Sequence, residues 1–439
     1  MADVAHFREQ LNQAIVAADI VKFFDVLLTI SVEMGASDIH IEPFEHYARV
    51  RLRVDGILEE LVQYPRNLHD SVISKFKIES GQMRPDEKRL PQDARVSTIT
   101  QTSKEIDLRA NTLPTVRGEK LCMRIVDKSK KIPPLEVLGI EGNNNKILYS
   151  GINLPNGIIL TTGPTGSGKT TTLYSAISQI NTVDVNITTF EDPVENKMFG
   201  LNQSQVRADI GFTFASGLRS ALRQDPDIIL VGEIRDHETL DMGMEAAMTG
   251  HLVFSTIHTN SAAETLTRII NLGAKGFMIA GSFNLIMAQR LVRRCCDLCS
   301  VKVNVKDHPH YERTKACFGS MDREALKQEI IMRGISPAQW TEYINEGWVT
   351  QGSGKDLHTG GVCSKCGGSG MKGRLGIYEV LDFTDDIKDL IVAEKSAMEL
   401  ERYALAHGLV SLERDAVLKL IKGVMPMDEI YSTVKHKSG

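Results

Sequence analysis

One short motif restricts the fold of this 439-residue chain more than any other feature of its sequence. Residues 163–170, GPTGSGKT, match the pattern G-x-x-x-x-G-K-[ST]. The apolar run IILTT comes directly before the motif, and TTTLYSAISQI, which can form a helix, follows its lysine. A strand, a glycine-rich turn and a helix in this order form a phosphate-binding loop, so a simple turn with an exposed lysine is disfavoured. The sequence therefore predicts a nucleotide site within an α/β fold.

The residues of this loop have distinct expected roles. The glycines let backbone N–H groups surround a β-phosphate, and the N-terminus of the following helix adds a favourable dipole. Lys169 is expected to bridge β- and γ-phosphate oxygens, and Thr170 to hold Mg²⁺. The expected nucleotide-binding residues are Gly163, Pro164, Thr165, Gly166, Ser167, Gly168, Lys169, Thr170 and Thr171. The motif indicates a nucleotide without specifying the reaction.

Short apolar runs separated by helical stretches predict the sheet around this loop. They are residues 156–164, 186–193, 227–233 and 250–259. This alternation is typical of a mostly parallel sheet with helices on both faces. A further apolar stretch, residues 276–292, is too short and too polar to span a bilayer and is expected to form a buried helix.

Acidic residues follow two of the predicted strands. Glu233 ends the run DIILVGE, where it is expected to reach Mg²⁺ or a water near the γ-phosphate, although many such acids are merely solvated. The segment FEDPVE (190–195) places Glu191, Asp192 and Glu195 on a loop, because Pro193 would end the strand. An acidic cluster at a helix N-terminus is the alternative, and spacing alone does not decide between the two.

Two histidines bracket the last predicted strand. On a regular strand, His251 and His258 point to opposite faces, so both cannot approach one phosphate. His258, beside the turn HTNSAAE, is the better candidate for a γ-phosphate sensor, and a core or surface histidine is the commoner alternative.

The N-terminal part of the chain has a different pattern. Residues 1–35 have helical periodicity, and residues 47–62 alternate strictly, with Asp55-Gly56 as a hairpin turn and arginines on one face. A second alternating run at 105–114 completes a predicted small α+β domain of about 125 residues. The charged, proline-containing segment 127–134 is a predicted linker. Residues 300–362 are polar and mixed, and 380–439 are expected to be helical.

Composition is typical of a soluble globular protein, and the cysteine count fits a reducing compartment. Hydrophobic residues make 42% and charged residues 24%, which excludes disordered and fibrous chains. The start of the chain has no signal-peptide pattern, and seven cysteines, an odd number, argue against a full disulfide framework. The net charge of −5 gives no global basic footprint for nucleic acid.

Four of the cysteines form two C-x-x-C pairs. Cys296, Cys299, Cys363 and Cys366 suit a tetrahedral structural Zn²⁺ that closes the segment 300–362 as one loop. That loop is longer than a usual zinc ribbon, and redox pairs are the alternative. Cys122, Cys295 and Cys317 are expected to be bystanders.

A series of segments resembles the type II secretion and type IV pilus assembly ATPases, the GspE/PilB family. The segments, in family order, are SDIHIEP, RLRVDG, RLPQDAR, LPTVRGEKLCMRI, GPTGSGKTTTLY, FEDPVE, LRQDPDIILVGEIRD, AAMTGHLVFSTIHTN, QRLVRRCCDLC and KGRLGIYEV. They cover nearly the whole chain from about residue 25. One departure is Ala94 in PQDAR, where the family usually has glycine.

The resemblance implies an α/β chain with a PAS-like α+β N-terminal domain followed by a RecA-like P-loop ATPase domain. The implied parts are residues 1–128 (PAS-like), 129–138 (linker), 139–290 (RecA-like core), 291–380 (tetracysteine zinc element) and 381–439 (helical C-terminus). Long family members carry a further N-terminal domain that docks onto an inner-membrane partner, whereas here the PAS-like region begins almost at Met1, so that contact is left open.

The resemblance also assigns roles within the nucleotide site. Glu195 matches the catalytically important acid of the Asp box, Glu233 is the Walker B glutamate, and His258 belongs to the His box. Arg95 and Arg109 correspond to N-terminal-domain arginines that reach the γ-phosphate as the ring closes, where a guanidinium offsets charge on the transferring phosphoryl group. A surface ion pair is the alternative for each arginine.

The implied activity is Mg²⁺-dependent hydrolysis of ATP by a cytoplasmic homo-hexamer held at the inner membrane through partners. The expected cofactors are ATP, Mg²⁺ and Zn²⁺, and the expected partners are an inner-membrane platform protein and a cytoplasmic membrane-associated adaptor, with no direct nucleic acid. Retraction ATPases generally lack the tetracysteine element, which favours assembly of pilin or pseudopilin subunits. A retraction or DNA-uptake motor and a nucleotide-gated scaffold without turnover are the competing hypotheses.

Overall fold

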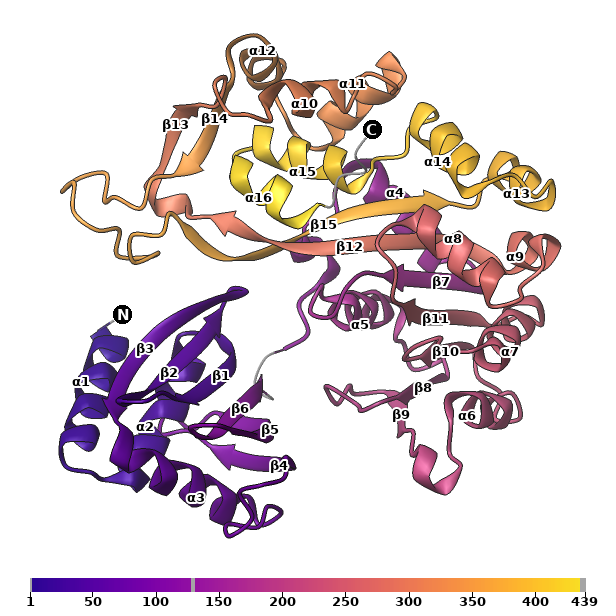
Figure 1. Ribbon diagram of the computed structural model, residues 1–439. Coiled ribbons are helices and arrows are strands. Elements are labelled where there is room, and N and C mark those ends of the chain that lie inside the picture. Colours follow the sequence, from indigo (N-terminus) through magenta and orange to yellow (C-terminus); the bar gives the residue numbers. More distant parts are fainter. Residues whose placement is uncertain (1, 128–130, 435–439) are drawn as a thin grey trace. The chain divides into compact units, whose positions relative to one another are not determined.

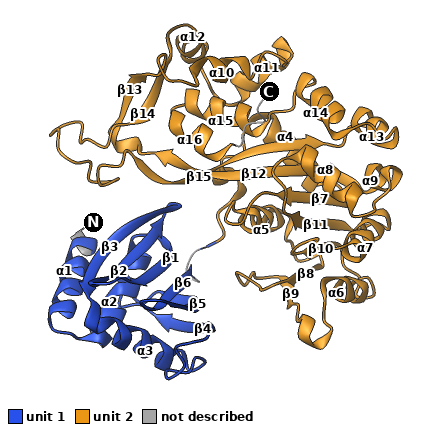
Figure 2. Ribbon diagram, in the orientation of Figure 1, with its two compact units in different colours: residues 1–131 blue, residues 132–439 orange. Residues whose placement is uncertain are grey.

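The computed structural model describes residues 2–127 and 131–434 and divides the chain into two compact units (Figures 1 and 2). Unit 1 comprises residues 1–131 and unit 2 residues 132–439. The predicted linker spans this boundary, and its residues 129 and 130 lie outside the described part of the chain. The same applies to Met1, residue 128 and residues 435–439.

Unit 1 is a six-stranded antiparallel sheet with helices. The strand order is β3-β2-β1-β6-β5-β4. The strands are β1 (Ala36–Pro43), β2 (Tyr47–Val54), β3 (Ile57–Pro65), β4 (Gln92–Ile99), β5 (Glu105–Thr115) and β6 (Gly118–Asp127). The α-helices are α1 (Ala2–Val16), α2 (Ile20–Glu33) and α3 (His69–Ser80), with a short 3₁₀ turn, η1 (Arg66–Leu68). The predicted hairpin is confirmed, because Asp55 and Gly56, both at positive φ, join β2 to β3.

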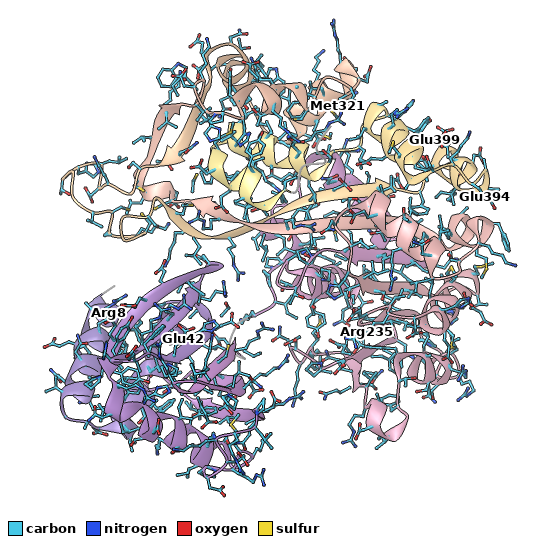
Figure 3. The ribbon with its side chains drawn as sticks, in the orientation of Figure 1. Arg8, Glu42, Arg235, Met321, Glu394 and Glu399 are labelled. Atoms are coloured by element: carbon cyan, nitrogen blue, oxygen red, sulfur yellow. The ribbon has the colours of Figure 1, made fainter. Side chains whose placement is uncertain are left out.

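The alternating pattern of β1 and β2 separates the two faces of this sheet. Apolar side chains such as Ile39 and Leu52 are fully buried in the core of unit 1. On the other face, the arginines of β2 are paired with acids, and Glu42 (Figure 3) accepts from Arg51 at 2.8 and 2.9 Å. Burial works to raise the pKa of Glu42, but hydrogen bonds from Arg51, Lys120 and Arg49 outweigh it and lower the pKa to about 2.

Unit 2 contains a seven-stranded sheet in the order β15-β12-β7-β11-β10-β8-β9. Its strands are β7 (Gly157–Thr162), β8 (Ile187–Glu191), β9 (Leu201–Gln205), β10 (Ile228–Val231), β11 (Leu252–Ile257), β12 (Phe283–Cys295) and β15 (Met371–Asp382). All neighbours are parallel except β15, which is antiparallel to β12. The four predicted apolar runs are therefore confirmed as β7, β8, β10 and β11.

Helices cover both faces of this sheet. They are α4 (Gly142–Ile152), α5 (Lys169–Ile180), α6 (Phe214–Ala221), α7 (His237–Met248), α8 (Ala262–Asn271) and α9 (Gly276–Ser282), with short 3₁₀ turns η2 (Leu135–Leu138) and η3 (Ala208–Ile210). Neighbouring residues of β7 enter different cores: Ile158 packs in the cluster that contains residues of α6–α9, and Ile159 in the cluster that contains residues of α4 and α5. This confirms the mixed α/β class expected from the sequence.

The predicted helix at residues 276–292 is wrong in its larger part. Only α9 is helical, and the chain then extends as β12 between β7 and β15. A strand that is buried on both faces has a continuous apolar sequence, which periodicity does not distinguish from a buried helix. β12 also runs through the expected boundary at 290/291, and β15 runs through the one at 380/381.

The segment between β12 and β15 is an insertion with its own structure rather than one loop. It contains η4 (Asp297–Cys299), β13 (Ser300–Asn304), α10 (Tyr311–Ala316), α11 (Arg323–Met332), α12 (Pro337–Glu346) and β14 (Trp348–Gly352). A buried Arg333 joins α11 to the C-terminal helices, because its Nη1 lies 2.6 Å from Asp415 Oδ1 and its Nε 2.5 Å from Glu329 Oε1. The carboxylates of Glu329 and Asp415 compensate the buried charge of Arg333.

The C-terminal residues after β15 are helical, as expected. They form α13 (Asp385–Val392), α14 (Ala397–Ala406), α15 (Leu412–Ile421) and α16 (Met427–Thr433). Across residues 2–127 and 131–434, no helix is both long enough and apolar enough to cross a membrane.

Candidate functional site

The phosphate-binding loop connects β7 to α5, as the motif predicts. Gly163 has a φ of 152° and Gly168 a φ of 88°, a region that residues with a side chain rarely adopt. A Cβ atom on Gly163 would also lie 2.5 Å from the backbone oxygen of Gln289. Glycine is therefore required where the loop leaves the sheet. Pro164, Thr165 and Gly166 are exposed at its tip.

Lys169 is held inside this loop. Its Nζ donates to the backbone oxygen of Gly163 at 2.7 Å and to that of Pro164 at 3.3 Å. Burial lowers the pKa of Lys169 to about 8; the charge of Glu233 opposes this shift and that of Arg290 adds to it. Phosphate oxygens are stronger partners for an ammonium group than neutral carbonyls, so this arrangement suits exchange for a polyphosphate.

Thr170 and Thr171 follow Lys169 in the first turn of α5. Both residues are exposed. This position leaves Thr170 accessible at the mouth of the loop, where the motif expects a Mg²⁺ ligand.

Glu233 contacts two other charged or titratable side chains. It follows β10, and its Oε2 accepts from Arg235 Nε at 2.9 Å. Its Oε1 lies 3.3 Å from Nε2 of His258, which follows β11. Glu233 and His258, which were identified separately in the sequence, are thus brought together.

Arg235 (Figure 3) was not among the predicted site residues, although it stands two residues after Glu233 in VGEIRD. The other histidine candidate, His251, lies at the opposite end of β11 from His258. There its Nδ1 is 2.9 Å from the backbone oxygen of Ala246.

Threonine hydroxyls connect the His258 loop to the start of the phosphate loop. The backbone N–H of Thr259 donates to Thr162 Oγ1 at 2.9 Å, and the two hydroxyl oxygens are 2.6 Å apart. Arg290 adds a second link, since its Nη2 donates to the backbone oxygen of Asn260 at 2.8 Å. Arg290 is buried beside Lys169 and was not predicted.

The carboxylates of FEDPVE have separate positions. Glu191, the last residue of β8, is buried and accepts hydrogen bonds from the Tyr174 hydroxyl and from Thr189 Oγ1, the latter at 2.6 Å. Tyr174 belongs to α5, so Glu191 fixes the helix that follows the phosphate loop. Glu195 is half-buried on the loop after the strand, with its backbone N–H beside the Tyr174 hydroxyl. Asp192 is exposed.

The four predicted cysteines converge at the base of the insertion. Their sulfur atoms all lie within 4.8 Å of one another, with Cys296 Sγ 3.9 Å from Cys363 Sγ and Cys299 Sγ 3.7 Å from Cys366 Sγ. Tetrahedral zinc with Zn–S bonds of about 2.3 Å requires S–S separations of about 3.8 Å. The cysteines therefore fit a structural zinc ion. Backbone N–H groups of Gly354 and Gly370 donate to two of the sulfurs at 3.3 Å.

The two arginines predicted to act on the γ-phosphate lie in unit 1. Arg95 on β4 is directly opposite Arg109 on β5. Arg124 on β6 continues this row, and its Nε donates to Asp38 at 3.1 Å. Arg95 is exposed and Arg109 half-buried. Arg124 was not among the predicted site residues, although it pairs with Arg109 in the same row.

The family model described as "Type II/IV secretion system protein" matches residues 13–432. The chain belongs to this family. The resemblance drawn from the motifs is thereby confirmed.

Pilus assembly ATPases and type II secretion proteins are among the relatives of this chain. The type IV pilus assembly ATPase PilB of Myxococcus xanthus is 40% identical over 428 residues, which cover 96% of this chain and 69% of the relative. PilB of Thermus thermophilus is 42% identical, and the match covers 93% of this chain but 42% of the relative. The type II secretion system protein E of Pseudomonas aeruginosa is 36% identical, with 100% of this chain and 80% of the relative covered.

Solved structures of an ATPase and of a pilus retraction motor have a similar fold. The Legionella pneumophila ATPase DotB matches with a TM-score of 0.63 and 21% identity, over 93% of this chain and 94% of the other. The pilus retraction motor PilT with bound ADP matches with a TM-score of 0.55 and 24% identity, over 92% and 95%.

Proposed function

We propose that this protein is a Mg²⁺-dependent ATPase that hydrolyses ATP to ADP and phosphate to power the assembly of pilin or pseudopilin subunits. The observation that carries the proposal is the contact between Glu233 and His258, which follow two neighbouring strands. The charge of Glu233 also acts on Lys169 of the phosphate loop. These residues come from three separate motifs, so chance proximity is a poor explanation. The names of the relatives support the same activity.

The proposed chemistry is in-line attack of water on the γ-phosphorus. Lys169 binds β- and γ-phosphate oxygens, Glu233 orients or activates the water, and His258 senses the γ-phosphate through Glu233. Glu195 is a second acid for this step. Mg²⁺, held by Thr170, would neutralise charge that develops on the phosphate oxygens.

The N-terminal domain completes the site in this proposal. Arg95 and Arg109 would bind the γ-phosphate when unit 1 closes, so that binding energy is converted into domain movement. The working assembly is a homo-hexamer in the cytoplasm, attached to the inner membrane through a platform protein and an adaptor. Its proposed functional parts are residues 1–128, 129–138, 139–290, 291–380 and 381–439, and β12 and β15 each continue across one of these boundaries.

The tetracysteine cluster favours assembly over retraction. Zn²⁺ at these cysteines is structural, because all four ligands come from the protein and leave no open position. A zinc-closed insertion is expected in assembly and secretion motors and generally absent from retraction motors.

The test measures the ATP hydrolysis rate per subunit against protein concentration, with Mg²⁺, for the full chain and for Arg95→Ala. We expect a specific rate that rises with concentration and falls at least about tenfold in the variant, because a shared, arginine-completed site needs an assembled ring. Arg8→Ala is the matched control, since Arg8 (Figure 3) is an exposed arginine of α1 in the same unit. A flat rate that Arg95→Ala leaves unchanged would contradict the interdomain mechanism.

Glu233→Gln separates the enzyme from a nucleotide-gated scaffold. In the enzyme, the variant should still bind ATP but hydrolyse it about 10²–10³ times more slowly, because the carboxylate that orients water is lost. If the unmodified chain, with its platform partner, binds ATP and hydrolyses none, the scaffold hypothesis replaces ours.

A further inference from the structure

A glutamine on the neighbouring strand supports the phosphate loop. β12 runs parallel to β7 with Ala288 opposite Thr162, the last residue of β7. Gln289 therefore lies beside the point where the chain leaves the sheet as the phosphate loop. It is fully buried, and its Nε2 donates to the backbone oxygen of Ser167 at 2.7 Å.

This hydrogen bond fixes the orientation of one peptide group. In a trans peptide the C=O and N–H point in opposite directions, so holding the Ser167 oxygen also fixes the N–H of Gly168. Gly168 is the N-cap of α5 and has a φ of 88°. Its N–H belongs to the end of the loop that the motif assigns to phosphate, and a bonded carbonyl polarises its own peptide N–H.

The loop and this glutamine are packed tightly together. A Cβ atom on Gly168 would lie 3.2 Å from Gln289 Nε2, and one on Gly163 would lie 2.5 Å from the Gln289 backbone oxygen. Both ends of the loop thus rest on the same residue of β12.

Fold stability alone does not explain a glutamine at position 289. Gln289 Oε1 and Ser167 Oγ are both buried without a hydrogen-bond partner among the described residues. A buried acceptor without a donor costs free energy that an apolar side chain of similar shape would avoid. A polar residue at this position therefore needs a reason other than core packing, and the hydrogen bond to Ser167 supplies it.

We propose that Gln289 is a positioning residue for nucleotide binding: it orients the Ser167–Gly168 peptide so that the loop is ready for a β-phosphate before nucleotide arrives. The proposal rests on the nucleotide site of the proposed function. It predicts that loss of the side-chain amide weakens nucleotide affinity without weakening the fold.

The experiment compares the full chain with Gln289→Met, which keeps the length of the side chain and removes its polar atoms. ADP affinity with Mg²⁺ is measured by titration calorimetry, and the unfolding temperature is measured without nucleotide. We expect the Kd for ADP to rise about tenfold. The unfolding temperature should change little, because removal of the unpartnered Gln289 oxygen offsets the loss of the donor to the Ser167 backbone oxygen.

Asn144→Leu is the matched control. Asn144 is also fully buried, donates its amide to a backbone oxygen (Tyr378, 2.8 Å) and leaves its own Oδ1 without a partner. It lies on α4 and contacts no residue of the phosphate loop through this bond. We expect its ADP affinity to equal that of the unmodified chain.

Gln289→Glu provides a second readout. A carboxylate facing the Ser167 oxygen cannot donate, whereas a protonated carboxyl group can. The affinity deficit of this variant, relative to the unmodified chain at each pH, should therefore shrink as the pH falls.

The proposal is overturned if Gln289→Met binds ADP within twofold of the unmodified chain, or if affinity and unfolding temperature fall together as for a packing residue. A deficit in Gln289→Glu that does not change with pH also contradicts it. If the unmodified chain itself binds no ADP, the proposed function fails, and that result is distinguishable from a failure of the positioning role.

Discussion

The phosphate loop and the tetracysteine cluster are both candidate ligand sites in unit 2, but their side chains are prepared in opposite ways. Lys169 and Glu233 already have protein partners: backbone oxygens for the lysine, and Arg235 and His258 for the glutamate. The four cysteine sulfurs instead converge on one point at separations close to those of a zinc tetrahedron.

This difference corresponds to how long each ligand is expected to stay. A nucleotide that replaces existing hydrogen bonds gains only the difference in free energy between the old and the new bonds. This keeps its binding reversible. The backbone N–H groups of Gly354 and Gly370 contact only two of the four sulfurs, whereas a metal ion between the cysteines satisfies all of them. The first arrangement suits a ligand that turns over, and the second suits a permanent structural ion.

The largest effect is expected at the phosphate loop, the exchanging site, where the ligand is bound and released in each turnover. Lys169→Ala should lower ATP hydrolysis by at least about 10³-fold, because no other group replaces the ammonium at the β- and γ-phosphates. The zinc content, measured by mass spectrometry of the metal, should not change. Lys146→Ala, at an exposed lysine of α4, is the control and should leave hydrolysis unaffected. A variant that retains more than a tenth of the activity would contradict the assignment.

The second-largest effect is expected at the tetracysteine cluster, the site of the permanent ion. Cys363→Ser should lose bound zinc and lower the free energy of unfolding by at least about 3 kcal/mol, because metal binding and folding of the insertion are coupled. Loss of zinc should change ADP affinity much less, because the two sites lie far apart along β12. Gln289 contacts the phosphate loop, and Cys295, which precedes the ligand Cys296, is six residues further on, about 20 Å along an extended strand.

Cys295→Ser is the matched control for this experiment. Cys295 is buried and adjacent to Cys296 but lies outside the four-sulfur cluster. It should keep one zinc ion per chain. Equal zinc loss in both variants would show that the cluster depends on general packing rather than on its four ligands.

The same contrast explains what the sequence could predict. The phosphate loop and the C-x-x-C pairs are local, because each motif carries its geometry within a few neighbouring residues. The contact of Glu233 with His258 depends on β10 lying beside β11, which sequence spacing does not specify. Gln289 and Arg290 were missed for a further reason: the stretch that contains them was interpreted as a helix, so their position beside β7 could not be inferred.

The buried acid Glu191 illustrates a second limit. Spacing placed three carboxylates of FEDPVE together without distinguishing their roles. The structure separates them by burial, because Glu191 is hydrogen-bonded to Tyr174 inside the protein while Glu195 lies on the loop. Burial depends on packing against α5, which no local pattern encodes.

The smallest effect concerns protons at Lys169. Because burial lowers its pKa to about 8, a sizeable fraction of the free protein carries a neutral lysine at pH 8, whereas a bound phosphate favours the charged form. Nucleotide binding should therefore take up protons near pH 8. If only the charged form binds, the apparent Kd for ADP should rise about tenfold between pH 7 and pH 9.

Titration calorimetry in buffers with different ionisation enthalpies measures this uptake directly. Lys169→Arg is the control, because a guanidinium stays protonated throughout this range and should show no uptake. Equal uptake in both proteins would assign the proton to another group. Zinc at the cysteine cluster should be retained across the same pH range in both, which would show that the proton dependence belongs to the exchanging site and not to the fold.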